Sequence, residues 1–387
     1  MLVGVPMEVK QAERRVGLTP TSVREVVGHG HRVVVERSAG AGIGAADDVY
    51  VAAGAEVVGT AAEVFERSDM VVKVKEPQAA ERAMLRHGQI LFTYLHLAPD
   101  PEQTADLVSG GATCIAYETV VGSDGKLPLL APMSQVAGRM SIQAGAHSLE
   151  SAQGGSGMLL GGVPGVPPAT VVVLGGGVVG ENATQMAVGI GADVVVLDRN
   201  TAVLEHLDHR FGATIRTVYS TRGAVEEWVR AADLVVGAVL VRGDRAPRLV
   251  SAEMLGEMRP GSVLVDVAID QGGCFETSRP TTHAEPTYVI DGVVHYCVAN
   301  MPGAVPKTST YALNNATLPY VLALADSGLD ALAADPGFLS GLNVHDGTVT
   351  EPHVAHSLGY EYMEPAAALA GQVHPGAVTS LGRPTTG

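Results

Sequence analysis

Short apolar runs alternate with amphipathic segments over the first third of the chain. The runs LVGV, HRVVVE, MVVKVK, QILFTYL and TCIAYE are bounded by turn-forming or polar residues, which is typical of β-strands. Between two of them, TPTSVREVVGHG fits an amphipathic helix that Thr19 or Thr21 would cap and that the region of Gly28 and Gly30 would end. This alternation predicts an α/β fold.

A second series of strands begins after residue 168. A helix is expected from about Pro132 to residue 153, as a connector that leads through the Gly/Pro-rich GGVPGVPPA to a new unit. The runs TVVVL, DVVVLD, ADLVVGAV and GSVLVDVAID are continuous and β-branched, as in parallel sheets. After ANMPGAVPKTSTYALNNATLPYVLALAD the pattern turns helical and is expected to stay so, and GQVHPGAVTSLGRPTTG has the composition of a frayed tail. We therefore expect an inserted parallel-sheet domain, 132–305, within a discontinuous domain formed by 1–131 and 306–387.

The stretch DMVVKVKEP places two lysines in an apolar strand. Lys73 and Lys75 would share one face, opposite Val72 and Val74. A solvated face is the more common arrangement, because lysine is almost never fully buried unless it is paired. Lys75 stands nearer the carboxyl end of the strand, before the strand-breaking Pro77, so we expect its ammonium to reach a ligand. Lys73 is expected to stay in solvent, and its removal to cost little.

Charge and cysteine content narrow the classes of function. The net charge of −16 opposes nucleic acid or an anionic membrane as a partner, which leaves small metabolites. The chain shows no run long enough to span a bilayer and no export signal. Three widely spaced cysteines predict neither a disulfide framework nor a thiolate metal site. We therefore expect no bound metal, and we expect a cytoplasmic location.

The segment GGGVVG carries a dinucleotide-binding signature. It follows the strand TVVVL and opens a helix, and the next strand ends in Asp198, about 20 residues further on. Gly175 would permit the tight turn, Gly177 the approach of backbone to a pyrophosphate, and Gly180 close helix packing. Asp198 would bind the adenosine ribose and repel a 2′-phosphate, which predicts NAD as the cofactor. A glycine turn without a ligand is the alternative.

Three later strand ends should reach the same crevice, because parallel sheets bind ligands beyond the carboxyl ends of their strands. They are 237–240, DVAIDQGG and CVANMPG. For Asp266, a structural role as a hydrogen-bond acceptor at a strand end and a functional role are equally compatible with the sequence. Asp270 lies further on, in a glycine-rich loop, which favours a functional role.

The motifs GLTP, VKVKEP, LFTYLHLA, GGGVVG, DVAIDQGG and NMPGAVPKTSTYALNNATLPY occur in this order, and with them the chain resembles bacterial alanine dehydrogenases along nearly its whole length. Transhydrogenase α subunits share parts of this plan but normally operate with a membrane-embedded proton channel. The resemblance implies two Rossmann-like domains with doubly wound parallel sheets, in which the NAD-binding domain is inserted into the catalytic domain. It also implies a homohexamer in amino-acid catabolism that oxidatively deaminates L-alanine to pyruvate and ammonium with NAD.

The same resemblance assigns five residues to catalysis and substrate binding. Arg15 and Lys75 would hold the substrate carboxylate and carbonyl oxygen, and His96 would be the acid/base, assisted by Asp270. Asn300 would lie near the substrate and nicotinamide. The resemblance further implies a set of cofactor-binding residues, the apolar ones less distinctively: Ser134, Gly175, Gly177, Val178, Gly180, Asp198, Ser220, Leu240, Ile269, Asp270 and Met301.

One departure and several alternatives stay open. Gly176 and Val179 stand where the family more often has alanine, which leaves the three required glycines intact. The ordinary pKa of histidine, about 6.5, suits the proton transfers that imine hydrolysis demands. On residues alone a core histidine is the slightly favoured interpretation of His96, and the family motif reverses this preference. Arg14 competes with Arg15 for a carboxylate. A catalytically silent NAD-binding protein is a further alternative, against which the joint presence of these residues argues.

Overall fold

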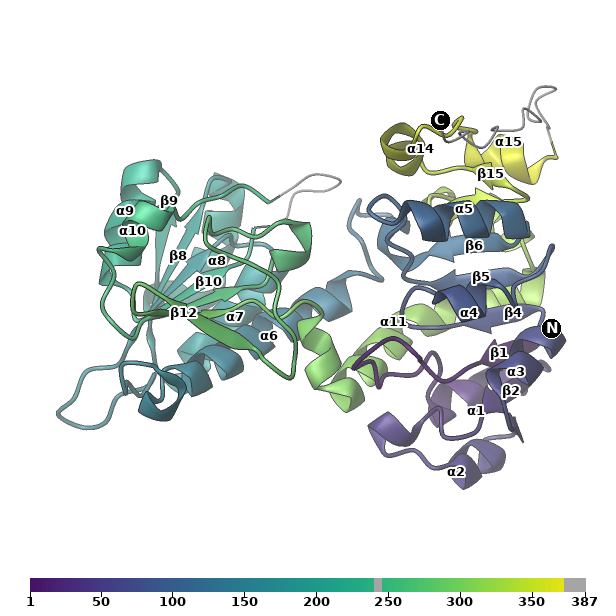
Figure 1. Cartoon of the computed structure of the whole chain (residues 1–387), viewed down its shortest axis with the longest axis horizontal. Coiled ribbons are helices and arrows are strands. Elements are labelled where there is room, and N and C mark those ends of the chain that lie inside the picture. The colour runs from purple at the N-terminus through teal and green to yellow at the C-terminus, as the bar shows by residue number, and fades with distance from the viewer. Residues whose placement is uncertain (240–245, 372–387) are drawn as a thin grey trace, which may run out of the picture. The chain divides into compact units, whose positions relative to one another are not determined.

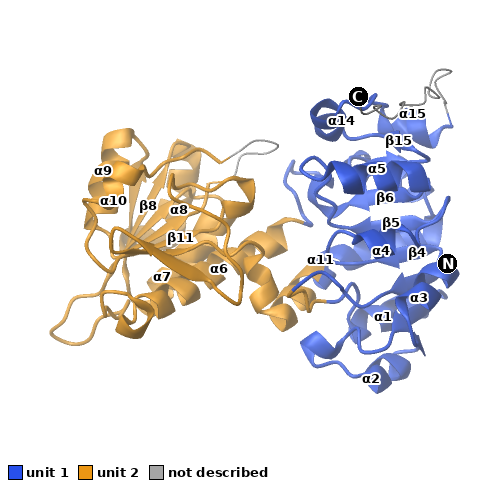
Figure 2. Cartoon of the chain, viewed as in Figure 1, with its two compact units in different colours: residues 1–11, 16–129, 314–387 blue, residues 12–15, 130–313 orange. Residues whose placement is uncertain are grey.

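The computed structural model describes residues 1–239 and 246–371, which divide into two compact units (Figure 2). The first unit contains residues 1–11, 16–129 and the described residues from 314 onward. The second contains residues 12–15 and 130–313. The expected tail 371–387, except for Gly371, and the cofactor candidate Leu240 lie outside the described residues.

The first unit is built on an eight-stranded sheet with the strand order β15-β14-β6-β5-β4-β1-β2-β3 (Figure 1). The strands from β6 to β3 pair in parallel, whereas β14 pairs antiparallel with β6 and β15. The strands are β1 Leu2–Val5, β2 Arg32–Glu36, β3 Glu56–Val58, β4 Met70–Val72, β5 Ile90–Thr93, β6 Thr113–Ala116, β14 Leu342–His345 and β15 Thr348–Val349. The helices are α1 Pro20–Gly28, α2 Asp47–Ala52, α3 Ala61–Arg67, α4 Ala79–Arg82, α5 Pro101–Gly110, α12 Asp330–Ala334, α13 Pro336–Leu339, α14 Pro352–Leu358 and α15 Pro365–Leu369.

The second unit is built on a seven-stranded sheet with the order β12-β13-β11-β10-β7-β8-β9, parallel except for the β12–β13 pair. Its strands are β7 Thr170–Leu174, β8 Asp193–Asp198, β9 Ile215–Tyr219, β10 Leu234–Gly237, β11 Val263–Asp266, β12 Thr287–Ile290 and β13 Val293–Tyr296. Its helices are α6 Ala131–Ser148, α7 Val178–Ile190, α8 Thr201–Phe211, α9 Arg222–Ala231 and α10 Ala252–Leu255. The long helix α11, Pro306–Ser327, runs from the second unit into the first along the chain.

Both sheets have the strand order of a doubly wound fold. Numbered along the chain, the parallel strands of each sheet run 3-2-1-4-5-6, the order typical of dinucleotide-binding folds. The direction of winding reverses between β1 and β4 in the first sheet and between β7 and β10 in the second. The predicted fold class, two Rossmann-like domains with one inserted into the other, is confirmed.

The second sheet is covered on both faces, which explains its continuous apolar strands. Along β7, Val171 and Val173 belong to a core that contains residues of α6 and α7. The alternate residues Val172 and Leu174 belong to another core, with residues of α9. A parallel strand with both faces buried has no polar side to show, as the sequence pattern indicated.

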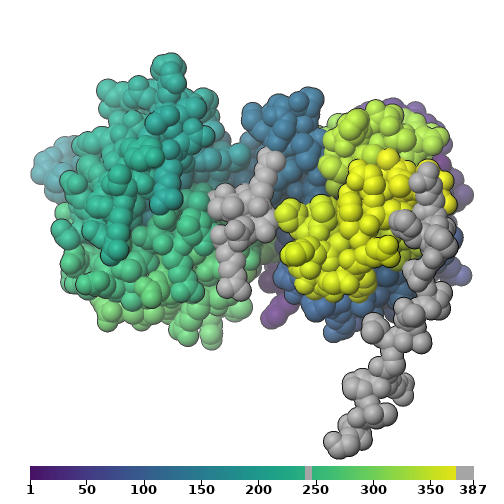
Figure 3. Space-filling view, turned by 90° about the horizontal axis from the view of Figure 1, so that it is seen from above, coloured from purple at the N-terminus to yellow at the C-terminus, as the bar shows by residue number. Residues whose placement is uncertain are grey.

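Two expectations about the elements need correction. The helix expected from Pro132 does more than lead into the second unit, because Ile142 within it and Leu149 just after it belong to the core of that unit. The chain after α11 is not all helical, because β14 and β15 complete the first sheet. These strands are short and mostly buried, whereas residues of α14 and α15 form part of the surface of the first unit (yellow in Figure 3). The expected cap of α1 is confirmed, with Thr19 Oγ1 accepting from the Ser22 N–H at 3.2 Å.

The expectation that Lys73 is solvated is wrong. Strand β4 ends at Val72, and the side chain of Lys73 is fully buried. Its ammonium lies 3.1 Å from Glu8 Oε2 and 2.6 Å from Glu81 Oε1, and both carboxylates are buried as well. Burial alone would lower the pKa of Lys73, but attraction to Glu8 and Glu81 outweighs it and raises this pKa. Lys73 is thus a lysine buried because it is paired.

This buried triad predicts that Lys73→Ala strongly destabilises the fold. Removing the ammonium leaves two buried carboxylates without their cation, which should cost about 3–5 kcal/mol. As a control, Lys126→Ala removes an exposed lysine that pairs with Asp124 and should change stability by no more than about 0.5 kcal/mol. Urea denaturation of both variants measures the difference. Equal midpoints would show that the triad contributes no stability.

Candidate dinucleotide and substrate sites

The glycine-rich turn after β7 has the backbone geometry of a phosphate cradle. Gly175 has φ 100°, and Gly180 lies so close to the turn that an added Cβ would stand 1.8 Å from the Gly175 carbonyl oxygen. Gly177, which precedes α7, has no heavy atom within 4 Å of its Cβ direction. Each glycine therefore has the property that its expected role requires, and the open space lies at a helix N-terminus.

Asp198 ends β8 and is held by main-chain donors. Its carboxylate accepts from the N–H of Gly176 at 2.7 Å and of Asn200 at 2.7 Å. The unusual glycine at 176 also has a packing reason, since an added Cβ would lie 2.6 Å from Val203 and 2.8 Å from Leu207 on α8. These side chains of α8 occupy the room that an alanine side chain at 176 would need.

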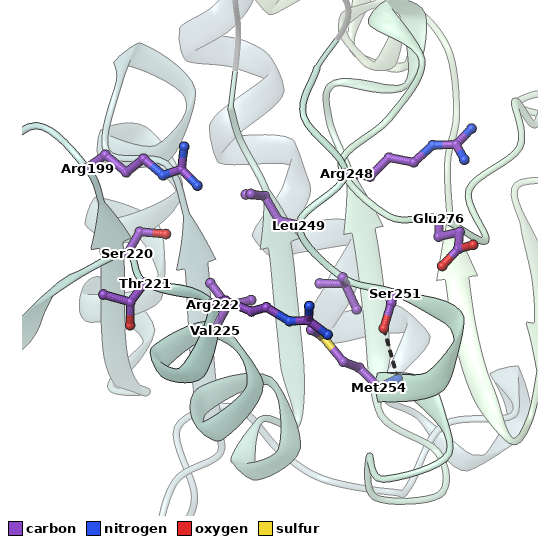
Figure 4. Close-up of a pocket in the computed structure, with 11 residues that line it drawn as sticks. Arg199, Ser220, Thr221, Arg222, Val225, Arg248, Leu249, Ser251, Met254 and Glu276 are labelled. Carbon is purple, nitrogen blue, oxygen red and sulfur yellow. Dashed lines mark hydrogen bonds between the residues drawn. The ribbon is translucent and has the colours of Figure 1, made fainter.

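A pocket of about 350 Å³ lies beyond the ends of β8 and β9 (Figure 4). Ser220, whose N–H donates to the Asp198 carbonyl at 3.0 Å, contributes to its wall together with Val225. Its rim carries the guanidinium groups of Arg199, Arg222 and Arg248. Sequence reasoning did not find this cationic rim, although Arg199 directly follows Asp198 in the chain.

The other cofactor candidates lie around the same sheet. Ser134 lies in the first turn of α6, and Val178, the first residue of α7, is 38% exposed. Ile269 and Met301 are buried in short 3₁₀ turns that follow β11 and β13.

Two aspartates, Asp266 at the end of β11 and Asp270 in the loop that follows, differ in burial and in hydrogen bonding. Asp266 is buried, and its carboxylate accepts from the Ser278 hydroxyl at 2.5 Å and from the N–H groups of Ala268, Cys274 and Phe275. Asp266 therefore has the structural role, because it ties together the loop 267–278. Asp270 is exposed in that loop.

Arg15 lies in the second unit, fully buried against a carboxylate. Its Nε donates to Glu13 Oε1 at 2.7 Å, and its Nη2 pairs with Glu13 Oε2 at 2.5 Å and donates to Asn300 Oδ1 at 2.8 Å. Asn300 in turn donates to Glu13 Oε2 at 3.1 Å and has a left-handed backbone, with φ 64°. The neighbouring Arg14 is exposed. The structure thus brings Arg15 and Asn300 together around Glu13, a residue that sequence reasoning missed.

Lys75 and His96 lie in the first unit, each three residues after the end of a strand, β4 and β5. The two strands are parallel neighbours, and the Thr93 hydroxyl of β5 donates to the Lys75 carbonyl at 3.0 Å. The His96 side chain is 42% exposed, so His96 is not a core histidine. It has φ 51°, its N–H donates to Glu118 Oε1 at 2.6 Å, and its Nδ1 lies 3.8 Å from the same oxygen. Glu118 was also missed by sequence reasoning.

None of the helices within 1–239 and 246–371 is long and apolar enough to cross a membrane. In the same ranges no group of three or more His, Cys, Asp or Glu side chains could hold a metal ion.

The fold and the glycine cradle define a dinucleotide-binding protein made of two doubly wound α/β units. Family models extend this: residues 4–137 match the alanine dehydrogenase/PNT N-terminal domain and residues 141–352 match the C-terminal domain. The chain belongs to the alanine dehydrogenase/PNT family.

Individual relatives are similar over nearly their full length. The chain is 61% identical to the alanine dehydrogenase of Halomonas elongata, over 96% of this chain and 100% of that one. It is 54% identical to the alanine dehydrogenase of Mycobacterium tuberculosis, over the same shares. Among solved structures, an L-alanine dehydrogenase matches with a TM-score of 0.91 and 54% identity, over 93% of this chain and 99% of that one. A transhydrogenase from Sinorhizobium meliloti matches with a TM-score of 0.78 and 26% identity, over 91% and 99%.

The buried Glu13–Arg15 pair predicts a pH-dependent contribution to stability. Burial would raise the pKa of Glu13, but hydrogen bonds and charge attraction from Arg15 outweigh it and lower this pKa to about 2. A carboxylate whose pKa is lower in the folded state stabilises the fold above its unfolded pKa and loses that effect as pH falls through the folded value. Glu13→Gln should therefore cost about 3 kcal/mol near neutrality, and the cost should shrink as pH falls below about 4.5 toward 2.

The measurement is the free energy of unfolding of Glu13→Gln and of the unmodified protein at several pH values. The exposed Glu227→Gln on α9 serves as the matched control. A difference between Glu13→Gln and the unmodified protein that stayed constant with pH would contradict the proposed charge pairing.

Proposed function

We propose that the protein catalyses the reversible NAD-dependent oxidative deamination of L-alanine to pyruvate and ammonium. The observation that carries the proposal is the combination, in one chain, of the glycine cradle after β7 with a lysine and an exposed histidine at the ends of the neighbouring strands β4 and β5. The 61% identity to an alanine dehydrogenase over nearly the whole chain supports the choice of substrate.

The residues around the second sheet fit the cofactor. The cradle of Gly175, Gly177 and Gly180 would hold the pyrophosphate at the N-terminus of α7. Asp198 would accept hydrogen bonds from the adenosine ribose, and Ser220 would line its adenosine end. The remaining contacts that we propose come from Ser134, Val178, Leu240, Ile269, Asp270 and Met301. When bound, NAD supplies the acceptor for the hydride that leaves the substrate α-carbon.

The substrate chemistry falls to five residues. Hydride loss leaves an imine, water adds to form a carbinolamine, and this collapses to ketone and ammonium. Each later step moves a proton, and we assign these proton transfers to His96, assisted by Asp270. Lys75 would donate to the substrate oxygen and stabilise the negative charge that develops on it.

The substrate carboxylate needs a cation, and we propose Arg15 rather than Arg14 on the basis of the motif ERRVGLTP. Glu13 and Asn300 fix the plane of its guanidinium. Asn300 would lie near both substrate and nicotinamide. Because Glu13 offsets the charge of Arg15, carboxylate recognition would depend on oriented N–H groups as much as on net charge.

A single assay tests the activity: NADH absorbance is followed with L-alanine and NAD, and then with pyruvate, ammonium and NADH. Turnover in both directions is expected. NAD(H) binding without turnover would favour the silent NAD-binding protein. Hydride transfer between two nicotinamide nucleotides, without alanine, would favour a transhydrogenase component, whose fold is similar.

Further parts of the proposal concern organisation. We propose that 1–131 and 306–387 form the catalytic domain and 132–305 the NAD-binding domain, that the subunit of 39.8 kDa assembles as a homohexamer, and that it serves alanine catabolism in the cytoplasm. The three cysteines, all unpaired and buried, are compatible with a reducing compartment. Light scattering of the purified chain measures the subunit number.

NAD should be preferred over NADP. The Asp198 carboxylate, fixed by Gly176 and Asn200, would repel a 2′-phosphate. Asp198→Ala should reduce the preference for NAD, measured as the kcat/KM for NAD divided by that for NADP. The rim guanidinium of Arg199 would then attract the 2′-phosphate of NADP without an opposing carboxylate. Equal kcat/KM values for NAD and NADP in the unmodified protein would contradict the role of Asp198.

His96→Ala should fold and bind NADH but lose a factor of about 10²–10⁴ in turnover, the usual contribution of a positioned acid/base. His353→Ala, which removes an exposed histidine of α14, is the control and should keep full turnover. In the unmodified protein, oxidative deamination should rise with pH through neutrality, because the base must start unprotonated. Wild-type turnover in His96→Ala would reject the acid/base assignment.

A further inference from the structure

The segment 73–75, which presents Lys75, leaves the sheet but keeps every main-chain N–H bonded. The Lys73 N–H donates to the Phe92 carbonyl of β5 at 3.1 Å. The Val74 N–H donates to Glu8 Oε1 at 2.6 Å, and the Lys75 N–H lies 3.4 Å from the same oxygen. A side-chain carboxylate that follows β1 thus accepts main-chain hydrogen bonds beyond the end of β4.

The carbonyls of the same segment are bonded too. That of Lys73 accepts from the Tyr117 hydroxyl at 3.0 Å, and that of residue 74 from the Tyr94 N–H at 3.4 Å. That of Lys75 accepts from the Thr93 hydroxyl at 3.0 Å. These partners belong to β5 and to residues that follow β5 and β6. Both the N–H groups and the carbonyls of the backbone that presents the Lys75 side chain are thus held by hydrogen bonds.

Glu8 can hold the backbone of residues 74 and 75 because its own side chain is held in place by other contacts. It is buried three residues after β1, beside the point where the winding of the first sheet reverses. The second carboxylate oxygen of Glu8 forms an ion pair with the ammonium of Lys73. The same ammonium also pairs with Glu81. Gly17 packs directly against the end of β4, where only a glycine fits, because an added Cβ would stand 2.2 Å from the Val72 carbonyl oxygen.

We propose that Glu8 is a positioning residue for Lys75: one carboxylate oxygen fixes the backbone of the substrate-binding lysine, while the other is held by the buried Lys73. The inference rests on the proposed function, in which Lys75 donates to the substrate oxygen. It answers why DMVVKVKEP contains two lysines. Lys73 anchors the carboxylate from inside the protein, and Lys75 is presented by it.

The test compares Glu8→Ala, Glu8→Gln, Lys75→Ala and the double variant Glu8→Ala/Lys75→Ala. Steady-state reduction of pyruvate gives KM and kcat, fluorescence titration gives the Kd for NADH, and thermal melting gives stability. Glu25→Ala, an exposed glutamate of α1 in the same unit, is the matched control and should keep all wild-type values.

Glu8→Ala should lower kcat/KM for pyruvate by up to about 10²-fold, the effect of misplacing a substrate-contacting group by about 1 Å. The Kd for NADH should not change. Glu8→Gln keeps an oxygen acceptor for the Val74 N–H but loses the charge that pairs with Lys73. It should therefore melt earlier yet retain most of the kcat/KM that Glu8→Ala loses.

The double variant separates positioning from general damage. If Glu8 acts through Lys75, its removal should cost little more once Lys75 is alanine, because effects within one interacting unit are not additive. Independent, multiplying effects would overturn the inference, and so would a folded Glu8→Ala with wild-type kcat/KM beside an impaired Lys75→Ala.

A Lys75→Ala variant with wild-type kinetics would instead remove the proposed role of Lys75, and the inference with it. Should Glu8→Ala fail to fold, Glu8→Asp replaces it. Its carboxylate is one methylene short of spanning both the Val74 N–H and Lys73, so kcat/KM for pyruvate is expected to fall. Wild-type kinetics in Glu8→Asp would overturn the inference.

Discussion

A parallel strand that is buried on both faces can offer polar chemistry only where it ends. The central parallel strands of both sheets are buried in this way, and several candidate functional groups lie at or within a few residues of the carboxyl end of a parallel strand. In the first sheet these are Glu8 after β1, Lys75 after β4 and His96 after β5; in the second they are Asp198 at the end of β8, Ser220 after β9, Asp270 after β11 and Asn300 after β13.

Leaving a sheet creates a second requirement, because the main-chain N–H groups beyond the last ladder bond need acceptors. Carboxylates meet it repeatedly here. Glu8 accepts from the segment that presents Lys75, Glu118 from the backbone of Leu95 and His96, and Asp266 from three N–H groups around the loop of Asp270. Part of the acidic surplus of this chain, 41 Asp and Glu against 25 Lys and Arg, thus serves to shape loops at the candidate sites.

Cations in this setting are seldom independent of carboxylates. Lys73 is enclosed by Glu8 and Glu81, and Arg15 by Glu13. Such buried pairs repay their desolvation only partly, so their clearest consequence is geometric: removing one member leaves the other charge uncompensated. The same pairs that hold the fold therefore also orient the groups proposed to meet the substrate.

The sequence by itself determined the α/β class, the inserted second domain and the dinucleotide cradle, because apolar periodicity and the spacing of Gly175, Gly177, Gly180 and Asp198 are local properties of the chain. It did not determine which lysine of VKVK is buried, that β14 and β15 return to the first sheet, or that Asp266 is structural while Asp270 is exposed. Only the tertiary structure decided these, because each depends on partners distant in sequence: Glu8 is 65 residues from Lys73, and β14 pairs with β6. Periodicity records whether a position tends to be buried, but a charged side chain is buried only where folding brings its counter-charge to meet it.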